Sequence, residues 1–144
     1  MIKQYKNDIY PMPLWILMGS DFPTLCKNYR LDDDAESRID EGALAGSDAL
    51  SIKCFNIHTL IRGCAIVLRD ERIDNLASLL DFVSHECGHV TIHMCNFFDM
   101  KATPDNTEPY CYLQGYIARC IGDYLMKTQN YTLNINDEGK IQKA

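Results

Sequence analysis

The sequence predicts an α+β fold, with antiparallel strands packed on two long helices. Two segments rich in Ile, Val and Phe, 49–57 and 61–69, are typical of strands. The segment 73–98 carries apolar residues at three- and four-residue steps, as an amphipathic helix does. A second helix is expected at 108–126. The 144 residues fit a single domain.

The first predicted element is a strand in the apolar run Leu14–Met18. Pro11 and Pro13 precede this run and indicate either an edge position or a late start of the strand. Residues 19–42 are polar and acidic, so we expect a loop with a short helix at most. The three aspartates at 32–34 lack the Gly and the final Glu of a calcium-binding loop, and we interpret them as a solvated turn.

The remaining elements follow in the order hairpin, helix, helix. The short connection at 58–60 predicts a β-hairpin between the two central strands. Pro104 breaks the helical pattern, and the next helix begins near Glu108, with Asn106 or Thr107 as N-cap and Pro109 in its first turn. We expect the domain core over about 45–126. The polar tail 127–144 is expected to be mobile or to add a late edge strand.

The composition argues against several classes of protein. The net charge is −6 and Lys and Arg do not cluster, so we expect no nucleic-acid partner. The seven cysteines are odd in number and form no CxxC pair, which favours reduced thiols in a cytoplasmic protein. The apolar run at 14–18 is too short for a signal sequence or a membrane span, so no membrane partner is expected.

The segment His85-Glu86-Cys87-Gly88-His89 matches the pattern H-E-x-x-H. Residues i and i+4 of a helix lie one above the other, about 6 Å apart, so two imidazoles can bind one ion. Glu86 is turned by about 100° from His85, where its carboxylate can accept a proton from water on the metal. This pattern predicts a Zn²⁺ site, with His85 and His89 as ligands and Glu86 as the catalytic base.

The position of this motif in its helix supports the metal-site interpretation. The apolar stripe passes through Val83, Cys87 and Val90, nearly opposite the two histidines. One face of the helix is thus expected in the core, and the other carries His85 and His89. The alternative is that both histidines are ordinary surface residues.

A catalytic zinc needs a third protein ligand, and we expect Glu108. It is the only acid between Asp105 and Asp123, and it begins the helix that follows the motif helix. Acidic residues also favour the first turn of any helix. Asp99 and Asp105 are the fallback ligands.

Other choices for this ligand fit less well. The metzincin pattern places Gly three residues and His six residues after His89, but Ile92 and Cys95 stand there. His93 lies two turns from His85, too far along the helix axis for a shared ion, and is expected to be an ordinary, partly exposed histidine.

A hydrolase of this kind also needs a donor for the developing oxyanion. Among Tyr110, Tyr112 and Tyr116, Tyr112 shares a helical face with Glu108 and is the candidate catalytic tyrosine, although a tyrosine is more often a packing ring. Asp81 could orient an imidazole or be a solvated acid. The strand at 61–69 is a candidate edge for pairing with an extended substrate.

HECGH followed by NTEPYCYLQGYIAR resembles the gluzincin metallopeptidases, which carry HExxH on one helix and a ligand Glu on the next. More narrowly, residues 45–125 are similar to small proteins of phages and mobile elements in Bacteroides-type bacteria. The resemblance implies a minimal zincin-like fold with His85, His89 and Glu108 on zinc. Larger gluzincins often carry an Asp four residues after the ligand Glu, where this chain has Tyr112.

Three functions follow as hypotheses. The first is a zinc-dependent hydrolase, specifically a small metallopeptidase that acts on a protein or peptide substrate. The second is a zincin-fold binding protein of phage or mobile-element origin that cleaves nothing, which the short chain favours. The third is a small helical interaction protein in which the motif is accidental.

Overall fold

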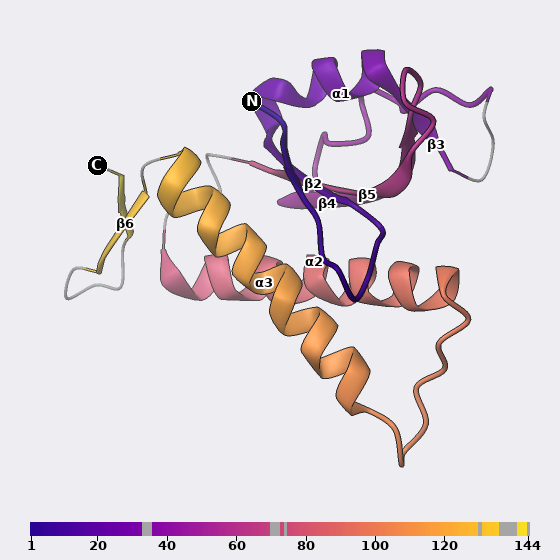
Figure 1. Ribbon diagram of the computed structural model, residues 1–144. Helices are drawn as coiled ribbons and strands as arrows, with labels where there is room; N and C mark the ends of the chain where they lie inside the picture. Colours follow the sequence, from indigo (N-terminus) through magenta and orange to yellow (C-terminus); the bar gives the residue numbers. More distant parts are fainter. Residues whose placement is uncertain (33–35, 70–72, 74, 130, 136–140, 144) are drawn as a thin grey trace.

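The computed structural model describes residues 1–32, 36–69, 73, 75–129, 131–135 and 141–143. Within these residues the chain is α+β, with a five-stranded mixed sheet, three α-helices and a separate two-stranded sheet (Figure 1). A 3₁₀ turn, Gly19–Asp21, precedes the first helix. The elements are β1 (Lys3–Tyr5), β2 (Leu14–Met18), α1 (Phe22–Asn28), β3 (Tyr29–Leu31), β4 (Ala49–Asn56), β5 (Arg62–Leu68), α2 (Leu76–Phe97), α3 (Glu108–Thr128), β6 (Tyr131–Ile135) and β7 (Ile141–Lys143).

The main sheet has the strand order β1-β2-β5-β4-β3. The hairpin expected from the sequence is confirmed, because β4 and β5 pair antiparallel from Ala49↔Leu68 to Phe55↔Arg62. β2 pairs parallel with β5 and antiparallel with β1, so it lies inside the sheet. Of the two interpretations of Pro11 and Pro13, the late start is therefore correct: the strand begins directly after Pro13.

Helices cover both faces of this sheet (Figure 1). Side chains alternate between the faces along each strand. On one face, Leu14 and Ile16 of β2 and Ile66 of β5 join the core that includes α2 and α3. On the other face, Trp15 and Val67 pack with α1 in a second core. The short helix expected within 19–42 is present as α1, whereas β3, which follows it, was not expected.

The two long helices begin close to their expected starts. The Asn75 side chain caps α2 by accepting a hydrogen bond from the Ser78 amide at 2.8 Å. The expected N-cap of α3, Thr107, is confirmed, although its side chain makes no capping hydrogen bond. The stripe predicted for α2 is buried at Cys87, Val90 and Met94.

Two hydrogen bonds tie α3 to the N-terminal part of the chain. The Tyr5 hydroxyl, on β1, donates to Oδ2 of Asp123 at 3.0 Å. The Tyr10 hydroxyl donates to the carbonyl of Pro109, in the first turn of α3, at 3.2 Å. α3 thus lies on the β1–β2 side of α2, and α2 lies against β4 and β5.

The C-terminal residues form their own small sheet. β6 and β7 pair antiparallel, from Tyr131↔Lys143 to Ile135↔Ile141, and do not extend the main sheet. The prediction that the tail adds a late edge strand is therefore wrong for these residues. In the parts of the chain that the structure describes, no helix is both long enough and apolar enough to cross a membrane.

Candidate metal centre

A cavity of about 370 Å³ lies between α2 and the beginning of β4. Its walls come from the HExxH turn of α2 and from the first residues of β4 with the segment just before it. The lining residues are Ser47, Ala49, Leu50, Ser51, His85, Glu86, His89 and His93. The histidines and the glutamate singled out by the sequence thus border one space.

His85 and His89 approach each other at one end of their rings. Their Nε2 atoms lie 2.9 Å apart, and the ring centroids lie 4.6 Å apart. Two nitrogens on one zinc, each at about 2.0–2.1 Å, would lie about 3.3 Å apart in tetrahedral geometry. In the structure these two nitrogens share a hydrogen bond, and their separation is a few tenths of an ångström shorter than that value. A small outward ring rotation, with loss of the shared proton, would direct both lone pairs to one ion.

Glu86 is buried, whereas the histidine and aspartate residues near it on the same helix are exposed. Its side chain is 5% exposed, whereas His85, His89 and Asp81 are exposed. Among the described residues no group donates a hydrogen bond to its Oε2. A buried acceptor without a donor is unfavourable by about 1–3 kcal/mol, so such groups are rare unless they bind something.

Cys87 lies on the other side of the helix, as expected from its position in the apolar stripe. It is buried in the core shared with α3, and burial raises the pKa of its thiol to about 12. The thiol is therefore protonated at neutral pH and unsuited to ligating a metal. A Cβ at Gly88 or Gly115 would meet nothing within 4 Å, so neither glycine marks a close contact between α2 and α3.

The structure separates Glu108 and Tyr112 from the two histidines. α3 packs on the stripe of α2 that contains Cys87 and Val90, nearly opposite the histidines. Figure 1 shows the beginning of α3 projecting away from the sheet. Glu108 is exposed there and Tyr112 is 70% exposed, and neither borders the cavity.

Of the other residues predicted for the site, His93 borders the cavity, whereas Asp81, Asp99, Asp105, Tyr110 and Tyr116 do not. The Tyr110 hydroxyl donates to the Met100 carbonyl at 2.8 Å, which ties it to the loop between α2 and α3. In the described ranges, no three His, Cys, Asp or Glu side chains are arranged to hold a metal ion. Glu108 as third ligand and Tyr112 as oxyanion donor stay predictions from the sequence, which this packing of α3 does not favour.

Sequence reasoning missed the contribution of β4. The strand at 61–69 was the candidate edge, but β5 lies between β2 and β4 and its edges are paired. β3 pairs only with residues 54–56 of β4. Within the described residues, the beginning of β4 therefore has one open edge, next to the histidines. No local pattern in the sequence distinguishes these two strands.

Comparison with known protein families, with curated proteins and with solved structures finds no match for this chain.

Proposed function

We propose that this protein is a zinc-dependent hydrolase with a zincin-like site, in which His85 and His89 hold the metal. The observation that carries the proposal is the convergence of two Nε2 atoms beside a buried carboxylate that lacks a hydrogen-bond donor. The fit of the histidine pair to zinc–nitrogen distances supports it. A zinc ion held there would lower the pKa of a water molecule and polarise a carbonyl group.

Glu86 is the proposed base. Glu86 borders the cavity, and its buried Oε2 has no hydrogen-bond donor among the described residues, so this carboxylate is proposed to accept a proton from a water molecule at the site. The same oxygen then delivers the proton to the leaving amine. Burial keeps competing water away from this carboxylate, and the rigid α2 backbone holds it one residue from His85.

The open edge of β4 supports a peptide as the substrate. The Lys53 carbonyl accepts a hydrogen bond from the Asp32 amide on the β3 side. Because backbone groups alternate along an antiparallel strand, those of Ser51 and Ala49 point to that side too. An extended peptide can pair with such an edge through its main chain. Ala49 and Ser51 border the same cavity as His85, so a paired peptide would pass beside the histidines.

Metal analysis with a matched histidine control tests this proposal. We expect purified protein to bind one zinc ion per chain, and His85→Ala to lose both that ion and the zinc-induced rise in melting temperature. His58→Ala is the control, because His58 is also exposed but lies in the β4–β5 turn beside Asn28. Glu86→Gln should retain zinc and lose peptide cleavage. Equal zinc binding by wild type and His85→Ala would contradict the proposed site.

A second candidate is a binding protein that holds an extended peptide at the β4 edge without cleaving it. The observation in its favour is that no three His, Cys, Asp or Glu side chains among the described residues are arranged to hold a metal ion together. Peptides recovered intact after incubation with the zinc-loaded protein, together with measurable peptide binding, would favour this alternative. Cleavage that a chelator abolishes would exclude it.

A further inference from the structure

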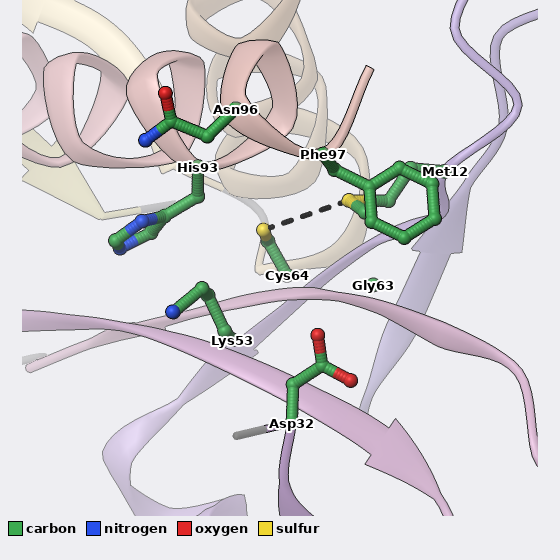
Figure 2. Close-up of a pocket in the computed structure, with 8 residues that line it drawn as sticks. All are labelled: Met12, Asp32, Lys53, Gly63, Cys64, His93, Asn96 and Phe97. Carbon is green, nitrogen blue, oxygen red and sulfur yellow. Dashed lines mark hydrogen bonds between the residues drawn. The ribbon is translucent and has the colours of Figure 1, made fainter. Parts of the chain in front are cut away.

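A second cavity, of about 210 Å³, continues the cleft between α2 and β4 towards the C-terminal end of α2 (Figure 2). His93 borders both cavities, so the second begins where the first ends. It is lined by Met12, Asp32, Lys53, Gly63, Cys64, His93, Asn96 and Phe97. Because a cavity of about 150 Å³ can hold benzene, this one has room for a phenyl ring.

The apolar part of the lining lies at one end of the cavity. Figure 2 shows Phe97 and Met12 at that end, with Cys64 between them and His93. The Cys64 thiol donates to the Met12 sulfur at 4.0 Å, so the two sulfur atoms satisfy each other and need no polar ligand. Sulfur atoms also make favourable contacts with aromatic rings. This end of the cavity therefore suits an apolar ligand.

Phe97 forms the exposed wall of this apolar end. It is 51% exposed, although it is a large apolar residue at the end of α2. Its ring packs edge to face with that of Phe98, and the ring centroids lie 5.1 Å apart. Phe98 in turn packs on the core that contains Met12. The Phe97 ring is thus supported from the protein side and leaves apolar surface in contact with water.

The polar residues of the lining have partners of their own. Asp32 pairs with Arg62, whose Nε lies 3.2 Å from Oδ1, and the protein encloses this oxygen. Lys53 and His93 interact with other groups of the chain. Asn96 is exposed, so water can hydrate its amide. A charged ligand therefore gains little from these groups, and the apolar surface decides what the cavity binds.

We infer that this cavity binds an apolar side chain with an aromatic ring, of which phenylalanine is the natural example. The ring would cover the open surface of Phe97 and contact the sulfur atoms of Met12 and Cys64. Two aromatic rings also attract each other in edge-to-face or offset arrangements. A charged side chain would lose part of its hydration there and would have to compete with the partners that Asp32 and Lys53 already have.

The role of this cavity as a substrate subsite rests on the proposed function, because it extends the same cleft along β4. Phe97 follows His89 by eight residues on α2, which is a rise of about 12 Å. Lys53 follows Ser51 by two residues on β4, which is about 7 Å. An extended peptide advances about 3.3 Å per residue. The bound ring would therefore belong to a residue about two to four positions from the bond beside His85 and His89.

Binding of five N-acetyl amino-acid methylamides to the full chain, measured by NMR chemical shifts, tests the inference. The probes carry phenylalanine, leucine, glutamine, lysine or glutamate side chains. We expect the phenylalanine probe to bind about twofold to fivefold more tightly than the leucine probe, because only the former makes ring contacts. It should bind about tenfold more tightly than the three polar probes. Its ring current should shift the methyl signal of Met12 and the amide signals of Gly63 and Cys64.

Two exposed residues of α2 provide a variant and its matched control. Phe97→Ser removes the open ring, so the phenylalanine probe should bind about threefold to tenfold more weakly. Ile92→Ser should leave all affinities unchanged, because Ile92 is 53% exposed on the same helix but borders neither cavity. The inference is overturned if the five probes bind alike or not at all, if the shifts centre away from Met12, or if Phe97→Ser retains the wild-type affinities.

The same measurements separate this inference from the proposed hydrolase. They are made with chelator present and repeated in Glu86→Gln, so that they depend neither on zinc nor on turnover. Selective binding of the phenylalanine probe by a protein that binds no zinc would overturn the hydrolase and keep the cavity assignment. Zinc-dependent cleavage without any selectivity for the phenylalanine probe would do the reverse.

Discussion

Replacement of Glu86 by methionine should stabilise the metal-free protein. Glu86 is 5% exposed, and its Oε2 has no donor among the described residues. Methionine has a similar size and needs no hydrogen-bond partner. Removal of an unsatisfied buried oxygen is worth about 1–3 kcal/mol. For a chain of this length, each kcal/mol changes the melting temperature by about 3–4 °C. Glu86→Met should therefore melt about 3–12 °C higher than wild type.

This gain should be measured by thermal unfolding in the presence of a chelator. Asp81→Asn is the matched control, because Asp81 lies on the same helix but is exposed. A surface change of this kind alters stability by less than about 0.5 kcal/mol. With zinc added, wild type and Glu86→Met should both gain stability, because both retain His85 and His89. A Glu86→Met protein less stable than wild type by 1 kcal/mol or more would show that Glu86 is a structural group, and the reasoning from its burial would fail.

Three further predictions concern the framework around the site. Gly63→Ala should destabilise the protein by about 1–3 kcal/mol in urea unfolding, because a Cβ there would lie 2.6 Å from the Trp15 ring. Gly115→Ala is the control: the space around Gly115 is open, so this variant should stabilise the protein by about 0.5–1 kcal/mol. Hydrogen bonds from Lys127, the larger effect, and from Tyr5 hold the pKa of Asp123 below its usual value. These bonds therefore stabilise the fold at pH values above the ordinary carboxyl pKa, and this stabilisation is lost as the pH falls through the lowered pKa of Asp123. Tyr5→Phe should raise the pKa of Asp123 in a carboxyl NMR titration; an unchanged value would mean that the Tyr5 bond is absent. In native protein one thiol, that of exposed Cys111, should react rapidly with an aromatic disulfide, and Cys111→Ser should abolish the fast phase.

The elements with strong local signals were predicted well. The β4–β5 hairpin and the two long helices follow from residue types and periodicity that span only a few neighbouring positions. The segment 19–42 was predicted less well: α1 fits the expected short helix, but β3 is only three residues long and has no pattern of its own. Its pairing with β4 depends on residues more than 20 positions away. The residues of β3 alone therefore do not show that this segment pairs with β4, because the pairing depends on the arrangement of the whole sheet.

The sequence by itself determined the histidine pair, because residues four apart on a helix share a face whatever surrounds them. It also determined that Cys87 would face the core. Only the tertiary structure decided which groups meet that pair. α3 packs on the side of α2 away from the histidines because its Leu113 and Ile117 are buried in the core that contains Val90. The hydrogen bond from Tyr10 to the Pro109 carbonyl, between residues 99 positions apart, ties the start of α3 to the N-terminal part of the chain. The cleft beside His85 is instead completed by β4, because β3 pairs only with residues 54–56 and, within the described residues, leaves the other edge of the beginning of β4 open. Helical phase is local, whereas the side on which a helix packs is set by contacts distant in the chain.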